Sequence, residues 1–89
     1  LSTIFNAIGC RVEVEKMIAT GRIDMVVETI HIIYVLELKL SNNGGIDAAA
    51  EQIRSRQYAE PFKADKRRVV ALAIELDDKG KGLIDWKEV

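Results

Sequence analysis

Residues 32 to 40 form an apolar run that only two charges interrupt. The run reads Ile-Ile-Tyr-Val-Leu-Glu-Leu-Lys-Leu and is followed by the polar stretch Ser-Asn-Asn-Gly-Gly. It is rich in β-branched and aromatic residues and too short for a typical helix, so we expect a buried strand. Because side chains alternate across a strand, one face should carry Ile33, Val35, Glu37 and Lys39. Two apolar faces indicate a central strand that is covered on both sides.

The remaining pattern predicts a helix at each side of a three-strand segment. In chain order we expect a short helix through residues 4–8, strands at 11–15, 23–28 and 32–40, a helix from 47 to about 59, and strands at 69–74 and 82–87. The second helix would be the crossover between Leu40 and Val69. The prediction is an α/β fold whose mixed central sheet is flanked by helices, in the order α-β-β-β-α-β-β.

Asp24 and Glu37 are expected to face each other across a hairpin. Asp24 ends the segment Gly-Arg-Ile-Asp, and an antiparallel hairpin is the economical connection to the strand beginning at Ile32. With the two-residue loop Ile30-His31, the register places Asp24 opposite Glu37. Two carboxylates about 4 Å apart repel by about 4 kcal/mol at an effective dielectric of 20, unless a cation lies between them. The pattern therefore indicates a divalent-metal site, although a lone acid-x-lysine on a strand more often marks a solvated sheet face.

Composition indicates a single domain and argues against disulfide-bonded, membrane-spanning and zinc-binding classes of protein. The 89 residues, 48% hydrophobic, suit one domain spanning 1–89, and a chain opening at Leu1 is expected to be a C-terminal fragment of something longer. The single Cys10 allows no internal disulfide, which favours a cytoplasmic setting, and no apolar run is long enough to cross a membrane. One histidine, His31, cannot build a zinc cluster or a cysteine-histidine nucleophile pair with the remote Cys10.

The charge balance does not by itself indicate a nucleic-acid-binding protein. Thirteen Lys and Arg against fourteen Asp and Glu give a net charge of −1, whereas such proteins usually carry a basic excess. Basic residues do gather on and after the second predicted helix, at Arg54, Arg56, Lys63, Lys66, Arg67 and Arg68. They either hold a phosphate backbone beside the site or form an ordinary solvated surface.

The motifs taken together resemble the PD-(D/E)XK nuclease superfamily. They are Glu15, Gly-Arg-Ile-Asp ending at Asp24, Tyr-Val-Leu-Glu-Leu-Lys ending at Lys39, Gln52-Ile53, and Tyr-Ala-Glu-Pro-Phe starting at Tyr58. More narrowly, the chain is similar to the nuclease-like domain at the C-terminus of predicted AAA-ATPase-like bacterial proteins. The usual proline before the aspartate is replaced by Ile23. The resemblance implies a restriction-endonuclease-like core.

The resemblance also implies roles for individual residues. Asp24 and Glu37 would bind Mg²⁺ (or Mn²⁺), and the backbone carbonyl of Leu38 could add a third oxygen. Lys39 would orient the attacking water or help to deprotonate it, and Gln52 would contact that water or the scissile phosphate. Glu15 either approaches the metal from a third strand or belongs to a solvated edge. Arg22 is expected on the face opposite Asp24, where it would pair with an acid or a helix end instead of touching substrate.

Two functions follow as alternatives. The first is a Mg-dependent nuclease domain that hydrolyses phosphodiester bonds of DNA, or less readily of RNA. The second is a non-catalytic nuclease-like module that regulates an ATPase domain of the same longer chain or recruits partners for it. The expected partners are nucleic acid and that ATPase, with no membrane. The first helix is cut short at Leu1, so a homodimer through that end is a further expectation.

Overall fold

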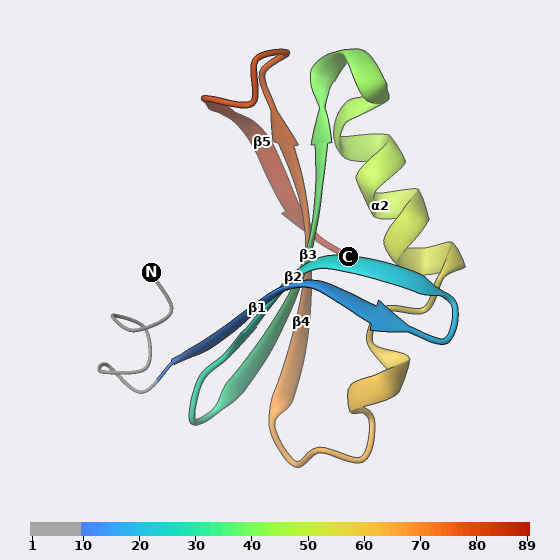
Figure 1. Cartoon of the computed structure of the whole chain (residues 1–89), viewed down its shortest axis with the longest axis vertical. Coiled ribbons are helices and arrows are strands. Elements are labelled where there is room, and N and C mark those ends of the chain that lie inside the picture. The colour runs from blue at the N-terminus through green and yellow to red at the C-terminus, as the bar shows by residue number, and fades with distance from the viewer. Residues whose placement is uncertain (1–9) are drawn as a thin grey trace.

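A computed structural model of the chain describes residues 10–89 (Figure 1). Five strands form one sheet in the order β1-β2-β3-β4-β5. Their bounds are Arg11–Ile18 for β1, Gly21–Glu28 for β2, Ile32–Leu40 for β3, Arg68–Leu76 for β4 and Leu83–Glu88 for β5. Helix α2 spans Gly45–Ser55, and short 3-10 turns lie at Ser41–Asn43 and Glu60–Phe62. Only β3 and β4 are parallel, and the other neighbouring strands are antiparallel.

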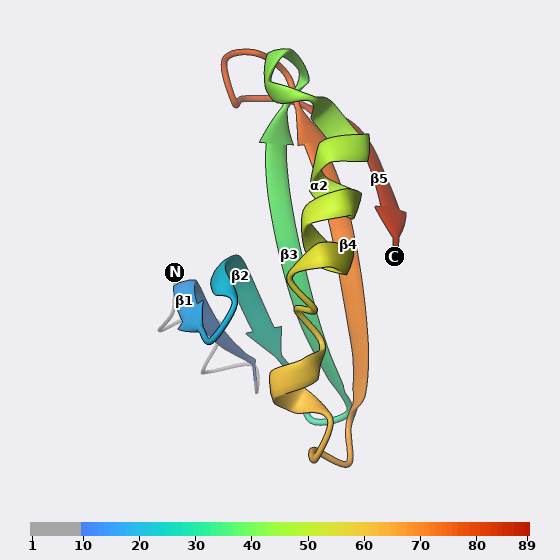
Figure 2. The same ribbon diagram turned by 90° about the vertical axis from the view of Figure 1, so that its right-hand side faces the viewer.

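The predicted α/β class and mixed sheet are confirmed. Helix α2 is the crossover between the parallel strands β3 and β4, as expected, and β5 is an outer strand. The predicted first helix lies outside the described residues. Within residues 10–89 the order is therefore β-β-β-α-β-β, and α2 covers one face of the sheet (Figure 2). None of the helices in this part of the chain is long and apolar enough to cross a membrane.

The largest differences from the predicted boundaries are at the ends of two elements, β1 and α2. Strand β1 continues to Ile18, three residues beyond the expected end at Glu15. Helix α2 ends at Ser55 instead of reaching Ala59. The cause at the helix end is local, because Gln57 has a φ of 52° and a right-handed helix cannot continue through that conformation.

The β2–β3 hairpin has the register that the sequence predicts. Met25 pairs with Leu36, and Val26 pairs with Val35. Thr29 closes the turn: its backbone N–H donates to the Ile32 carbonyl at 2.8 Å, and its hydroxyl accepts from the Ile32 N–H at 2.9 Å. Extending this register by one residue sets Asp24 opposite Glu37.

The ladder between β2 and β3 stops beyond Met25 and Leu36. Ile23 would be the next hydrogen-bonding partner of Leu38, but these two residues form no ladder pair, while Ile23 keeps its pairing with Lys16 of β1 on its other side. Here β1 and β2 bend away from β3 toward the side on which α2 lies (Figure 1). The N–H of Leu38 is satisfied by the Asp24 side chain, whose Oδ2 lies 2.9 Å away. A side chain has taken the place of a backbone carbonyl where the strands separate.

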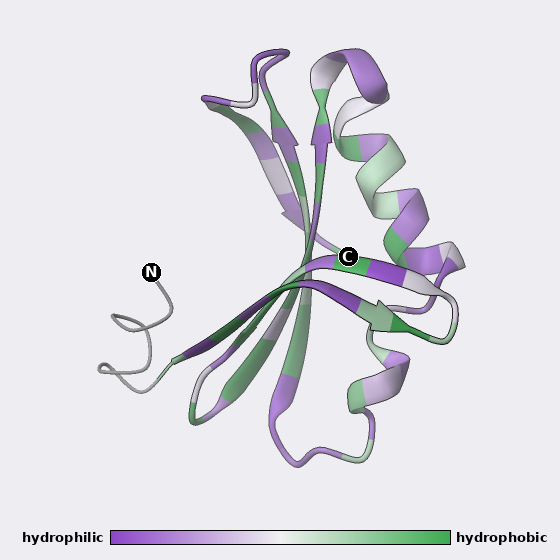
Figure 3. Ribbon diagram, viewed as in Figure 1, coloured by the Kyte–Doolittle hydropathy of each residue, from purple (hydrophilic) through white to green (hydrophobic). Residues whose placement is uncertain are grey.

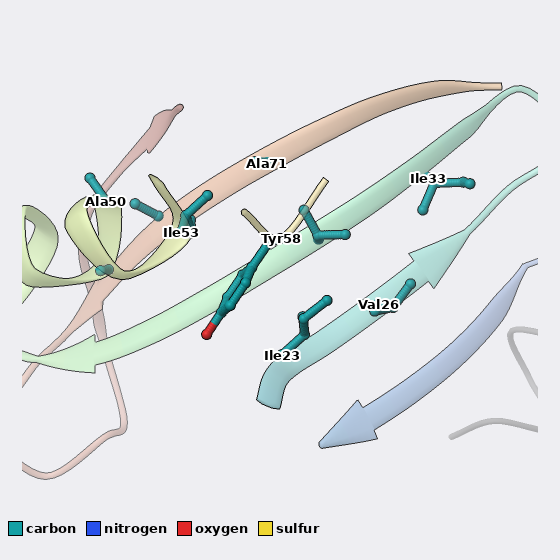
Figure 4. Packing of buried hydrophobic residues seen from close by; sticks show 10 residues of the cluster. Ile23, Val26, Ile33, Ala50, Ile53, Tyr58 and Ala71 are labelled. Carbon is teal, nitrogen blue, oxygen red and sulfur yellow. The ribbon is translucent and has the colours of Figure 1, made fainter. Parts of the chain in front are cut away.

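The core lies between α2 and the sheet (Figure 4). Its buried members are Ile23 and Val26 of β2, Ile33 and Val35 of β3, Ala49, Ala50 and Ile53 of α2, Tyr58, and Ala71 and Ala73 of β4. Alanine on both α2 and β4 allows the helix axis to approach the strands closely. Figure 3 shows that apolar residues follow the strands while the loop between α2 and β4 is polar. Ile33, Val35 and Glu37, which the sequence predicts to share one face, are all buried. The sequence also predicts that the other face of β3 is covered, but its side chains are only half-buried: Tyr34, Leu36, Leu38 and Leu40.

Glu75 of β4 fixes the N-terminus of α2. Its Oε1 accepts a hydrogen bond from the Ile46 N–H at 3.0 Å, and its Oε2 accepts one from the Ser41 hydroxyl. A carboxylate at this end also interacts favourably with the helix dipole. A Cβ at Gly45 would lie only 2.6 Å from Glu75 Oε1, so glycine is required for this approach. The contact sets the position of α2, and hence of Gln52, relative to β3.

Candidate active site

A cleft of about 610 Å³ opens where β2 separates from β3. Four residues predicted as catalytic, Asp24, Glu37, Lys39 and Gln52, line it together with Leu38. The other lining residues are Met17, Gly21, Arg22, Leu40, Asn43, Arg56 and Leu76. Residues from two strands and one helix, up to 28 positions apart in the chain (52 − 24), therefore meet in one cavity.

Asp24 lies close enough to Glu37 to affect the pKa of Glu37. Glu37 is 2% exposed, while Asp24 is half-buried at the cleft. Burial raises the pKa of Glu37, and the nearby negative charge of Asp24 raises it further. Hydrogen bonding from Tyr58 and the charge of Lys39 act in the opposite direction. The expected juxtaposition of the two acids is therefore present, and it makes the site receptive to a cation.

Lys39 supplies the nearest positive charge to the buried acid. Its Nζ lies 3.7 Å from Glu37 Oε2, and its side chain is 29% exposed. The ammonium group therefore lies between the buried carboxylate and the solvent. Glu37 and Lys39 share one face of β3 because they are two residues apart on the strand.

Gln52 reaches the site through Tyr58. Its Nε2 donates to Tyr58 Oη at 2.8 Å, and this hydroxyl lies 2.8 Å from the Arg22 carbonyl and 3.0 Å from Glu37 Oε1. Tyr58 is completely buried, and burial raises its pKa to about 12, so the phenol stays protonated. Its single proton can be given to only one of the two oxygens at a time. The hydroxyl thus ties α2, β2 and β3 together at the bottom of the cleft.

Glu15 points away from this group. It lies opposite Asp24 in the β1–β2 register but has no ladder partner, and its φ is 54°. An unpaired residue in this conformation redirects its side chain, as at a bulge. The side chain is 68% exposed and its Oε1 lies 3.6 Å from Arg22 Nη1. The structure therefore places Glu15 at a solvated edge, outside the residues that line the cleft.

The sequence pattern misplaced one polar residue of the cleft and gave no signal for another. Arg22 pairs with an acid as expected, but the expected position on the face opposite Asp24 is wrong, because residues two apart on a strand share a side, and Arg22 lines the cleft. Asn43 lies in the 3-10 turn Ser41–Asn43, where no sequence motif marks it. Arg56 belongs to the basic group expected beside the site, and it also lines the cleft. Tyr58 stood within the recognised motif, but its link to Glu37 depends on a contact across 21 residues.

The donors suit a small, hard divalent ion. Within residues 10–89 no group of three or more His, Cys, Asp and Glu side chains could hold a metal. Mg²⁺ needs fewer, because it keeps several waters and is often bound through one or two carboxylates and a substrate phosphate. The Leu38 carbonyl points to the same side as its N–H, toward Asp24, where no strand partner follows. Asp24, Glu37 and this carbonyl fit such an ion.

Comparison with known proteins agrees with this geometry. A family model described as the PD-(D/E)XK nuclease superfamily matches residues 1–86. No curated protein and no solved structure matches the chain. The family name gives an aspartate followed later in the chain by acid-x-lysine, and Asp24, Glu37 and Lys39 match these positions. The chain therefore belongs to the PD-(D/E)XK nuclease superfamily.

Proposed function

We propose that this domain is a Mg²⁺-dependent nuclease that hydrolyses phosphodiester bonds of DNA. The single observation that carries the proposal is the convergence of Asp24, Glu37 and Lys39 on one open cleft. Two clustered carboxylates beside one lysine are costly for a fold unless a cation and an anionic substrate use them. The family to which the chain belongs supports nuclease activity.

Each residue has a distinct task in this proposal. Asp24 uses Oδ2 to accept from Leu38, which fixes the carboxylate and leaves Oδ1 for a ligand. Glu37 is held by Tyr58 on Oε1 and faces Lys39 with Oε2. The Lys39 ammonium orients the attacking water and offsets the negative charge that develops on the phosphoryl oxygens. When bound, the metal ion would add Lewis-acid stabilisation of those same oxygens.

Gln52 has a supporting task. One N–H of its amide donates to Tyr58 Oη, which leaves the second N–H and the carbonyl oxygen for other partners. The oxygen can accept from the attacking water, and the free N–H can donate to the scissile phosphate. We therefore assign Gln52 to the water or to that phosphate.

Calorimetric titration with Mg²⁺ or Mn²⁺, run beside a DNA cleavage assay, tests the proposal. The parent should bind metal and cleave, Asp24→Asn and Glu37→Gln should lose both, and Lys39→Ala should bind metal but not cleave. Glu13→Gln is a matched control, because Glu13 is a partly exposed acid of β1 outside the cleft. Parent-like cleavage by Asp24→Asn and Lys39→Ala would exclude these roles.

A second candidate is a non-catalytic module that serves an attached AAA-ATPase-like domain. The net charge of −1 favours it, since a protein that holds DNA by itself usually has a basic excess. On this alternative, the parent binds no divalent metal in the same titration and cleaves no nucleic acid. We also predict an attached ATPase domain, a homodimer and a cytoplasmic location. These predictions are compatible with either candidate function.

A further inference from the structure

The side chain of Arg56 lies against Gly21 of β2, the strand that carries Asp24. Arg56 follows helix α2 directly and lines the same cleft as Asp24 and Glu37. Its side chain passes over Gly21 so closely that a Cβ there would lie 2.8 Å from Nη1 and 3.1 Å from Cδ. The absence of a side chain at Gly21 is therefore what admits the guanidinium to this wall of the cleft.

The backbone of Arg56 is held from two directions. Its N–H donates to the Gln52 carbonyl at 3.0 Å, and its carbonyl accepts from the hydroxyl of Thr20, the residue before Gly21. The chain then turns sharply at Gln57, whose φ is 52°. Thr20 and Gly21 thus act together: one binds the main chain of Arg56 and the other makes room for its side chain. The placement is prepared before any ligand arrives.

The charge of Arg56 has no counterpart among the residues that the structure describes. Both other cations of the cleft have one, since Arg22 lies 3.6 Å from Glu15 and Lys39 lies 3.7 Å from Glu37. Arg56 forms no ion pair within 4.0 Å in residues 10–89. An exposed guanidinium that lines a cleft on a fixed main chain, without a carboxylate partner, is suited to an anionic ligand.

We propose that Arg56 binds a backbone phosphate of the nucleic acid next to the phosphate that is cleaved. The inference rests on the proposed function, which places the scissile phosphate near Asp24, Glu37 and Lys39. The guanidinium presents several N–H donors in a planar fork, which matches the non-bridging oxygens of a phosphate. Arg56 would hold the strand in register without taking part in the chemistry, as backbone-contacting residues do.

Binding of a short fluorescent DNA duplex, measured by anisotropy with Ca²⁺ in place of Mg²⁺, tests the inference. Arg56→Gln should weaken binding roughly tenfold and lower the slope of log K against log salt by about 1. Arg56→Lys should keep most of the salt dependence, because the charge stays, but bind less tightly than the parent because the fork is lost. Gly21→Ala should resemble Arg56→Gln, since the new methyl displaces the guanidinium.

Arg54→Gln is the matched control. Arg54 lies two residues earlier, in the last turn of α2, and does not line the cleft. It should leave the affinity and the salt slope close to those of the parent. If Arg56→Gln and Arg54→Gln lower affinity and slope equally, the effect is general electrostatics and the inference is wrong. Parent-like binding by Arg56→Gln, or no DNA binding by the parent, would also overturn it.

The outcome separates this inference from the nuclease proposal. Metal affinity, measured by calorimetry without DNA, should be the same in Arg56→Gln as in the parent, whereas Asp24→Asn loses it. A parent that binds DNA through Arg56 but never cleaves it would refute the nuclease proposal and keep the phosphate site. If the parent cleaves DNA and Arg56→Gln binds DNA with the affinity and salt slope of the parent, the nuclease proposal stands and the phosphate site is refuted.

Discussion

The carboxylate of Asp24 accepts a hydrogen bond from the backbone N–H of Leu38, with 2.9 Å between Oδ2 and N. The two residues lie on neighbouring strands at the point where the ladder between those strands has ended. One side chain therefore replaces a main-chain partner and also enters the cleft. The Leu38 carbonyl lies on the same side of β3 as this N–H, so the separation of the strands leaves it open toward the site as well.

This relationship predicts different stabilities for two substitutions of Asp24. Asp24→Asn keeps an oxygen that can accept from the Leu38 N–H, so its free energy of unfolding should stay near that of the parent in metal-free buffer. Asp24→Ala leaves a partly buried N–H without a partner and should lose about 1–3 kcal/mol. Urea denaturation with a chelator present measures both, and equal stability of the two variants would contradict the assignment of this bond.

Glu37 should make the metal-free protein less stable as pH rises. Burial and the Asp24 charge raise its folded-state pKa above the ordinary 4.5. Above pH 4.5 the unfolded chain loses this proton first, so the free energy of unfolding falls until the pH passes the folded-state pKa. Glu37→Gln should remove this fall and be the more stable form at neutral pH. Thermal denaturation across this pH range with a chelator checks the sign.

Added Mg²⁺ should reverse that order at neutral pH. An ion that binds only the folded state stabilises it by an amount that grows with the logarithm of the ion concentration once this exceeds Kd. The parent should therefore gain melting temperature with increasing Mg²⁺, while Glu37→Gln should not. If millimolar Mg²⁺ does not change the melting temperature of the parent, no metal binds at Asp24 and Glu37.

Tyr58→Phe should lower both stability and activity. The phenyl ring still fills the core, but Gln52, Glu37 and the Arg22 carbonyl lose their shared hydroxyl. We expect a loss of about 1–3 kcal/mol in unfolding free energy and a weaker metal affinity, because Glu37 is no longer oriented. Tyr34→Phe is the matched control, since Tyr34 lies on the opposite face of β3. Equal effects from both substitutions would show that the hydroxyl of Tyr58 has no special role.

Glu15 should be dispensable for metal binding. Its side chain is exposed and faces Arg22, so Glu15→Gln should leave the calorimetric Kd for Mg²⁺ within about twofold of the parent. Glu15→Gly should slightly stabilise the fold, because glycine adopts a φ of 54° without strain. Loss of metal binding in Glu15→Gln would instead show that Glu15 turns inward as a third ligand.

The hydrophobic pattern predicted most of the sheet because strands and tight turns are local features. The run at 32–40, the hairpin loop at Ile30-His31 and the helical crossover all follow from neighbouring residues, and the structure has each of them. The pairing of Asp24 with Glu37 on one face followed from register alone. Alternation is broken in β2, where Ile23 and Val26 are both buried although they are three residues apart, and in β1, where the neighbours Val14 and Glu15 are both exposed.

By itself, the sequence determined which residues become strands and that two acids and a lysine share a face, because alternation and turn length act over a few residues. Only the tertiary structure decided that β2 leaves β3 at this point, that Tyr58 joins Gln52 to Glu37, and that Arg56 crosses Gly21. These contacts join residues 6 to 35 positions apart (58 − 52 and 56 − 21). They depend on where α2 packs, and no local pattern encodes that packing.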